Sequence, residues 1–257
     1  MKSLLVLLVL VPLVGMAKSP FDGTWKTRKD SIQMTGKPDV FSLGNGMYEC
    51  RSCAPAYQIK ADGTDQPVPG HSYVDHEAVS VQGPMSVAFT DKKAGKVMST
   101  QTMTVSADGG HLTTKWTSYV GEKPISGSQT EKRVAPAAAG AHAISGSWML
   151  DSVAEVSDAA LTTVLQSTDN GMRMVWNGQT TDARFDGKEY PTMGDAGKTM
   201  VSLKKISDYQ MEETDRRLGK VTDVTLWTAA KDGKTLSAVD TDPQHGTKTS
   251  WVADRMP

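Results

Sequence analysis

Alternation of apolar and polar residues predicts strands along most of this chain. Apolar side chains gather on every second position in segments such as 97–105 and 221–227, which is the period of a strand with one buried face. All three asparagines stand directly before glycine, and Asp-Gly pairs begin at positions 22, 62, 108, 186 and 232. These dipeptides supply the positive φ angles of tight hairpin turns. The pattern predicts an all-β protein of short antiparallel strands.

The segment SDAALTTVLQST, residues 157–168, also fits a short helix with Ser157 as its N-cap. Its consecutive β-branched residues, Thr162, Thr163 and Val164, favour a strand. We therefore expect a strand here, and about eight strands in each half of the chain. Such a meander closes as a barrel or folds over as a sandwich.

Two copies of one unit make up the chain. FDGTW at 21–25 recurs as ISGSW 123 residues later, and the Asp-Gly pairs at 62 and 108 recur 124 residues later. Agreement of these offsets indicates an internal duplication. The small-residue stretch 135–143 is typical of a linker. We expect one β-barrel repeat over 21–134 and a second over 144–257.

The N-terminus predicts export. Lys2 precedes an apolar run over 4–14, and Gly15 and Ala17 stand where a signal peptidase needs small residues. We expect a signal peptide over 1–17, cleaved after Ala17, and a periplasmic or secreted protein without a membrane span, since the run is shorter than the roughly 20 residues that a bilayer requires. Cleavage leaves 27 basic and 29 acidic residues. This net charge of −2 argues against nucleic-acid binding.

Each copy carries a Gly-x-Trp near its start and an arginine near its end. Trp25 is followed by Arg133, and Trp148 by Arg255, 108 and 107 residues downstream. This arrangement resembles the lipocalin and calycin barrels, in which a first-strand tryptophan plugs the barrel floor and a last-strand arginine lies across its indole. The resemblance implies two tandem lipocalin-like barrels with Trp25 and Arg133 in one and Trp148 and Arg255 in the other.

The second copy is also similar to a group of uncharacterised secreted bacterial proteins. Their units have the form GTW…DGK.YP..G…VSLKRI, which the segment FDGKEYPTMGDAGKTMVSLKKI at 185–206 follows closely. The resemblance covers ISGSW at 144 through SWVADR at 250–255. It implies the same fold and an exported protein, and it names no activity.

Cys50 and Cys53, the two cysteines of the chain, permit three interpretations. Alignment with the second copy places them at the tip of a hairpin, where the second copy has Asn177-Gly178. A disulfide that holds an exposed turn is therefore enough to account for the cysteine pair. With His71 and His76 they also match the ligand types of a zinc site, Cys-x2-Cys-x17-His-x4-His, although the middle segment is longer than usual. A Cys-x-x-Cys can serve in thiol redox chemistry, but Pro55 argues against the helix that such a centre uses.

No catalytic motif occurs in the sequence. It lacks a Gly-x-Ser-x-Gly elbow, a His-Glu-x-x-His, a Walker loop and a dinucleotide fingerprint. We therefore expect no catalytic residues and no cofactor, and a non-enzymatic protein that binds a small apolar or amphipathic ligand in a barrel. The alternatives are an envelope structural or protein-interaction module with filled barrels, and an enzyme based on the cysteine pair or an unrecognised acid pair.

Overall fold

The structure, a computed structural model, describes residues 19–257, and strands make up most of it. The first part of the chain forms β1 (Gly23–Thr27), β2 (Gln33–Gly36), β3 (Asp39–Gly44), β4 (Met47–Cys50), β5 (Tyr57–Lys60), β6 (Asp62–Pro67), β7 (His76–Gly83), β8 (Ser86–Lys93), β9 (Lys96–Val105), β10 (His111–Ser118) and β11 (Ile125–Ala135). The second part forms β12 (Gly146–Val156), β13 (Thr162–Thr168), β14 (Gly171–Trp176), β15 (Gln179–Arg184), β16 (Tyr190–Met193), β17 (Met200–Ser207), β18 (Gln210–Arg217), β19 (Lys220–Ala229), β20 (Thr235–Asp242) and β21 (Thr247–Arg255). Two short helices, η1 (Lys29–Ser31, a 3₁₀ turn) and α1 (Asp158–Leu161), complete the fold.

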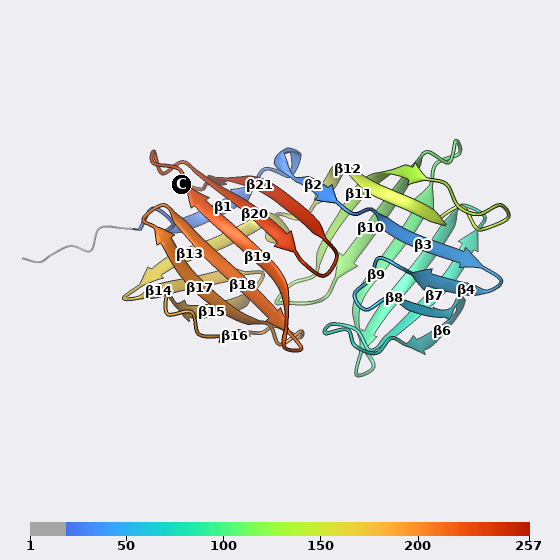
Figure 1. The fold of residues 1–257 in the computed structure, drawn as a ribbon, viewed down its shortest axis with the longest axis horizontal. Coiled ribbons are helices and arrows are strands. Elements are labelled where there is room, and N and C mark those ends of the chain that lie inside the picture. Colours follow the sequence, from blue (N-terminus) through green and yellow to red (C-terminus); the bar gives the residue numbers. More distant parts are fainter. Residues whose placement is uncertain (1–18) are drawn as a thin grey trace, which may run out of the picture.

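These strands form two barrel-like antiparallel sheets that lie side by side (Figure 1). The C-terminal barrel is an 11-stranded sheet that runs β1, β13 through β21 in order, then β2, and pairing of β1 with β21 joins its ends. The N-terminal barrel is a 10-stranded sheet in the order β5-β4-β3-β12-β11-β10-β9-β8-β7-β6. The predicted all-β class with two barrel-like sheets is confirmed.

The strand count differs from the expected eight per copy. Several additional strands are only four residues long, among them β2 (QMTG), β5 (YQIK) and β16 (YPTM). Four residues are too few to show a clear alternation, so the sequence pattern does not separate them from turns. The segment 157–168 divides between both interpretations, because α1 occupies its start and β13 the remainder. The strand prediction was therefore wrong for Asp158–Leu161.

The first strand of each sequence copy lies in the barrel built mainly from the other copy. In Figure 1 the blue β1 runs among the orange and red strands, paired with β13 and β21. In return β12 pairs with β11 and β3 of the N-terminal barrel. The N-terminal barrel therefore spans 39–156, and the C-terminal barrel combines β1 and β2 with 162–255. This division differs from the repeat boundaries expected from the sequence.

Each barrel encloses its own apolar core. The core of the C-terminal barrel contains Phe21, Trp25, Leu165, Met172, Met174, Ala183, Val201, Leu203, Met211, Trp227, Ala229, Leu236, Ala238 and Ala253. The core of the N-terminal barrel contains Phe41, Leu43, Tyr48, Cys50, Ile59, Val68, Val79, Val87, Phe89, Met103, Val105, Leu112, Ile144 and Trp148. Trp25 and Trp148 are 1% and 0% exposed. Each exchanged strand therefore contributes the large buried indole of the barrel that it enters.

The stretch expected as a linker packs against the N-terminal barrel. The backbone N–H of His142 donates to the carbonyl of Leu43 at 2.9 Å, and its Nε2 lies 2.7 Å from the carbonyl oxygen of Gly83. Ala143 contacts the core and Ile144 is fully buried within it. Only the end of this connection, at His142 and Ala143, therefore packs against the barrel just before β12 begins, whereas residues 136 and 138–140 are exposed.

Between residues 19 and 257, no helix has the length and apolar character needed to cross a membrane. The expected signal peptide over 1–17, with its cut after Ala17, lies outside the described residues. Export to the periplasm or the medium therefore stays a prediction.

Candidate ligand-binding site

A stacked tryptophan and arginine close one end of each barrel. The Arg255 guanidinium lies 4.3 Å from the ring centroid of Trp25, and that of Arg133 lies 4.0 Å from the ring of Trp148. Each indole N–H donates to the carbonyl four residues earlier at 2.8 Å. The stacking expected from the lipocalin resemblance is present, but its partners are exchanged. The sequence placed Trp25 with Arg133, and the structure places it with Arg255, because β1 lies beside β21.

The same arginines also satisfy backbone carbonyls around the floor. Arg133 donates to the carbonyls of Gly109, Ser145 and Ala143 at 2.6, 2.6 and 2.8 Å. Arg255 donates to the equivalent carbonyls of Gly233, Asp22 and Pro20. A buried carbonyl without a donor is costly, so these contacts stabilise a closed floor. Any opening for a ligand is therefore at the other end of each barrel.

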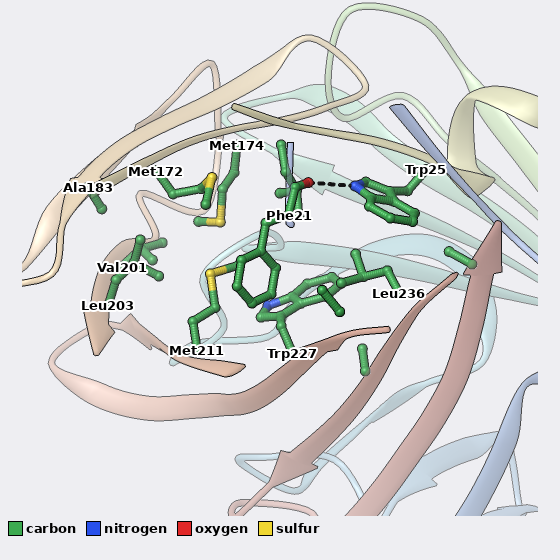
Figure 2. Close-up of a cluster of buried hydrophobic side chains, with 14 residues drawn as sticks. Phe21, Trp25, Met172, Met174, Ala183, Val201, Leu203, Met211, Trp227 and Leu236 are labelled. Atoms are coloured by element: carbon green, nitrogen blue, oxygen red, sulfur yellow. Dashed lines mark hydrogen bonds between the residues drawn. The ribbon is translucent and has the colours of Figure 1, made fainter. Parts of the chain in front are cut away.

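A cavity of about 750 Å³ is formed mainly by the C-terminal barrel, and strands β10, β11 and β12 of the N-terminal barrel supply another part of its wall. Its apolar wall includes Leu165, Met174, Val201, Trp227 and Trp251. The rings of Trp227 and Trp251 meet edge to face with centroids 5.8 Å apart. Figure 2 shows Trp227 and Met174 pointing into the barrel interior. Volumes of roughly 300–1,000 Å³ are typical of small-molecule sites, so this space is large enough for a small ligand.

The polar part of this wall contains two carboxyl groups and Arg217, together with several threonine and glutamine side chains. Glu213 and Asp215 alternate on β18 and line the cavity. The Trp227 indole N–H donates to Glu213 Oε2 at 2.7 Å. Asp215 lies directly opposite Asp223 on β19, and its Oδ1 is buried with no hydrogen-bond partner within the described part of the chain. Burial, together with neighbouring carboxylates, raises the pKa of both Glu213 and Asp215.

Arg217 and Tyr73 stand where the two barrels meet. Arg217 donates to Asp223 Oδ2 at 2.8 Å and to Thr199 Oγ1 at 3.0 Å. Its guanidinium lies 5.4 Å from the ring centroid of Tyr73, which the N-terminal barrel contributes. Both residues line the first cavity and also a second cavity, of about 520 Å³, whose wall combines residues of the N-terminal barrel between 53 and 101 with residues of the C-terminal barrel between 217 and 245. The two cavities therefore lie on either side of this stacked pair.

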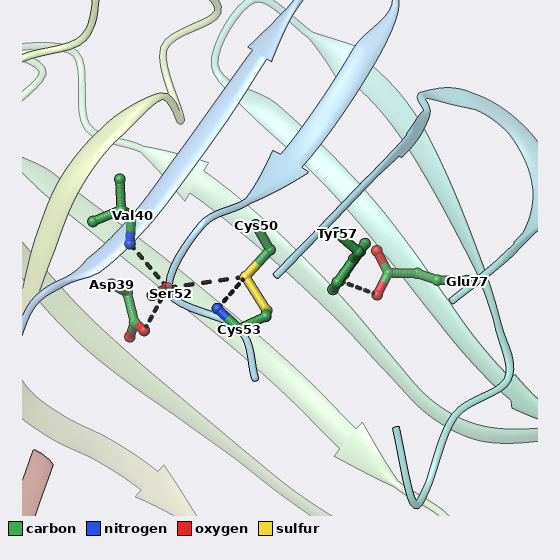
Figure 3. Close-up of a disulfide and its surroundings, with 7 residues drawn as sticks. All are labelled: Asp39, Val40, Cys50, Ser52, Cys53, Tyr57 and Glu77. Atoms are coloured by element: carbon green, nitrogen blue, oxygen red, sulfur yellow. Dashed lines mark hydrogen bonds between the residues drawn. A yellow bond between two sulfur atoms is a disulfide. The ribbon is translucent and has the colours of Figure 1, made fainter. Parts of the chain in front are cut away.

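The cysteine pair forms a disulfide at the end of the β4–β5 hairpin (Figure 3), with Cα atoms 5.4 Å apart. The second copy joins the equivalent strands through Asn177-Gly178, as the alignment predicted. The expected exposure of this turn is wrong for Cys50, which is 1% exposed and belongs to the core. A disulfide can be attacked at either sulfur, so burial closes Cys50 to attack while the half-buried Cys53 leaves the thiol-redox alternative a prediction.

The zinc alternative does not assemble in this structure. Its two thiolates are joined to each other. The His71 ring packs edge-on against Tyr57, with centroids 5.3 Å apart, whereas His76 Nδ1 lies 2.9 Å from Asp75 Oδ1 at the surface. Across residues 19–257, no group of three or more His, Cys, Asp and Glu side chains is arranged to hold a metal ion. The four residues therefore do not form a ligand set.

The interior carboxyl groups were not singled out by the sequence, although a signal for them was present. Glu213 corresponds to Phe89 of the first copy at the duplication offset of 124, and Phe89 is a buried core residue. A charged residue at a position where the first copy has an apolar core residue indicates a polar group inside the second barrel. Reading the duplication position by position would have identified Glu213 as a candidate.

Comparisons with protein-family models, with curated proteins and with solved structures find no match for this chain. The lipocalin-like relationship therefore stays a prediction. The two cavities are the structural features that bear on the function.

Proposed function

We propose that this protein is a non-enzymatic, lipocalin-like binding protein that holds a small amphipathic molecule in the larger cavity, which its C-terminal barrel forms together with strands β10, β11 and β12. The observation that carries the proposal is the cavity of about 750 Å³, which has an apolar wall and carboxyl groups in the same space. Apolar lining with a few placed polar groups is the usual composition of a small-molecule site. An exported carrier of this kind agrees with the signal peptide expected from the sequence.

The cavity wall favours a ligand with an apolar body. Trp227 and Trp251 present two indole surfaces, and Leu165 and Val201 extend the apolar wall toward the closed floor. Burying apolar ligand surface here contributes about 25 cal/mol per Å². The alternative of a structural module with filled barrels stays a prediction, because part of this space lies between the two barrels.

The polar groups favour a ligand head that donates hydrogen bonds. Asp215 Oδ1 is buried and lacks a donor anywhere in residues 19–257. Leaving such an oxygen unsatisfied costs about 1–3 kcal/mol, which a ligand hydroxyl or amine would relieve. Above about pH 8, where Glu213 and Asp215 are ionised despite their raised pKa values, these two carboxylates would repel an anionic head.

Tryptophan fluorescence at about pH 9 tests this proposal, because four indoles, those of Trp116, Trp176, Trp227 and Trp251, lie in the cavity wall. We expect alkyl amines and alcohols of one chain length to shift the emission at saturable concentrations, and the matching alkyl carboxylate to bind at least tenfold more weakly. Thr192, whose Oγ1 lies 2.8 Å from that of Thr181 in the cavity wall, offers a blocking position. Thr192→Phe should abolish the shift, whereas Thr168→Phe on the exposed end of β13 should not. Equal binding by both variants would overturn the proposal.

A further inference from the structure

The two barrels meet through equivalent turns of the two sequence copies. Residues 70–75 of the first copy correspond to residues 194–199 of the second at the duplication offset of 124, and we call this pair the junction turns. The Lys93 Nζ donates to the backbone carbonyl of Ser72 in one turn and to that of Ala196 in the other, the second at 3.1 Å. One ammonium group therefore holds the junction turns against each other.

The junction turns lie at the end of each barrel that is away from its closed floor. The carbonyls of Gly109 and Gly233, in the β9–β10 and β19–β20 turns, accept from the floor arginines. Lys93 and Arg217, which contact the junction turns, are the last residues of β8 and β18. They therefore lie at the opposite ends of β9 and β19 from the two floors. The barrels thus face each other with the ends that their floors leave open.

A tyrosine of the first copy crosses this junction, and the second copy has no equivalent of it. The residue that corresponds to Tyr73 is Gly197, and the two pack on each other. A Cβ atom on Gly197 would lie 2.5 Å from the Cζ of Tyr73, so the absence of a side chain makes room for the ring. The Arg217 guanidinium lies 5.4 Å from the ring centroid, and the Tyr73 hydroxyl oxygen lies 3.4 Å from Thr199 Oγ1. Groups of the C-terminal barrel therefore fix a ring that the N-terminal barrel contributes.

The Tyr73 ring stands between two cavities of different character. Within residues 19–257, only Tyr73 and Arg217 line both the larger cavity and the one of about 520 Å³. Hydrogen-bonding side chains in the wall of this second cavity include His71, Glu77, Asp91, Asp242, Gln244 and His245. Tyr73 therefore separates a space that suits an apolar body from one that suits a polar group.

Strand β18 leads the polar groups of the larger cavity toward this ring. Glu213, Asp215 and Arg217 are alternate residues, so their side chains lie on one face of the strand, and all three line the larger cavity. From Glu213 to Arg217 the strand runs away from the floor and toward the junction. A ligand head that reaches the two acids consequently lies next to the stack of Arg217 and Tyr73.

We infer that Tyr73 determines how large a polar head the bound ligand can carry. The inference rests on the amphipathic site proposed above and adds the basis of its specificity. With the ring in place, a hydroxyl or amine head fits beside the acids, whereas a head the size of a sugar meets the ring. Steric exclusion of this kind is a common source of specificity. Removing the ring joins the two cavities, and the polar wall of the second cavity can then receive the larger head.

Octanol and octyl glucoside test this inference, because they share one apolar chain and differ in the size of an uncharged head. Tryptophan fluorescence of the full-length protein at about pH 9, below the concentrations at which micelles form, measures both affinities. At this pH the Tyr73 hydroxyl stays protonated, since burial raises its pKa to about 12. We expect Tyr73→Ala to lower the ratio of octanol affinity to octyl glucoside affinity at least about tenfold, because the larger head then avoids the clash. Tyr73→Phe, which keeps the ring, should leave the wild-type ratio unchanged.

The ratio distinguishes a barrier from a merely structural contact. A substitution that only loosened the junction would weaken both ligands by the same factor, so an unchanged ratio in Tyr73→Ala would overturn the inference while octanol binding upheld the amphipathic site. If Tyr73→Ala does not fold, Tyr73→Leu takes its place, with a change of the ratio in the same direction. Failure of the wild-type protein to bind octanol would instead refute the amphipathic site, and the inference with it.

Discussion

Replacing Trp25 with alanine tests the strand exchange, because this residue belongs to the first sequence copy and packs in the C-terminal barrel. Its side chain is 1% exposed, its indole N–H donates to the Phe21 carbonyl at 2.8 Å, and the Arg255 guanidinium lies 4.3 Å from its ring centroid. Truncating a buried tryptophan costs about 3–5 kcal/mol, out of roughly 5–15 kcal/mol for a whole domain. We expect Trp25→Ala to bring the C-terminal barrel close to unfolding, while the N-terminal barrel, with its own Trp148, is unaffected.

Hydrogen exchange measured by mass spectrometry separates the two barrels by their peptides. Trp25→Ala should raise exchange in the peptides of the C-terminal barrel alone, and Trp148→Ala, the matched control, should do so in the N-terminal barrel alone. In double-mutant cycles Trp25 should couple with Arg255 by about 0.5–2 kcal/mol, and with Arg133 by close to zero. Loss of protection in the N-terminal barrel of Trp25→Ala would refute the exchange.

Three further outcomes follow from the geometry. Burial raises the pKa of Glu77 from 4.5 to about 8, so between these pH values the folded state keeps a proton that the unfolded chain loses. The free energy of unfolding should therefore fall over this range by up to about 1.4 kcal/mol per pH unit. Urea unfolding at several pH values should show a flatter dependence on pH for Glu77→Gln than for the wild-type protein. Asn177→Ala should lower the free energy of unfolding by about 1–3 kcal/mol more than Asn45→Ala does. Both residues have a positive φ, but only the Asn177 side chain donates to two carbonyls of the N-terminal barrel. Equal losses of stability for the two variants in thermal denaturation would contradict this. Replacing Cys50 and Cys53 with serine should lower the stability of the N-terminal barrel by at least about 2 kcal/mol, from loop entropy and the burial of Cys50, with no change expected in exchange of the C-terminal barrel.

Local rules predicted the turns and the position of the disulfide well. The Asn177-Gly178 turn has φ angles of 45° and 79°, as an Asn-Gly hairpin requires. The same asparagine also donates to the carbonyls of Val120 and Lys123 in the other barrel, a contact that no local pattern indicates. Likewise, the sequence placed Cys50 at a hairpin end but did not show that its sulfur is buried.

The candidate sites depended on register, which the sequence leaves open. Glu77 and Asp91 are 14 residues apart, and they oppose each other only because the β7–β8 hairpin pairs as it does. A shift of one residue would turn both side chains to the outside. The tryptophan and arginine residues of the two floors were identified correctly as a set, whereas their pairing was not.

The sequence by itself determined the strand class, the duplication and most of the turns, because each depends on residues close together in the chain. Only the tertiary structure decided which barrel each first strand enters. FDGTW and ISGSW offer nearly the same side chains to either barrel, so local preference hardly distinguishes the two arrangements. The choice depends on closure of the sheets and on the connections that lead into β3 and β12, which are properties of the whole fold. The two cavities, and the acids that face them, exist only once that closure is made.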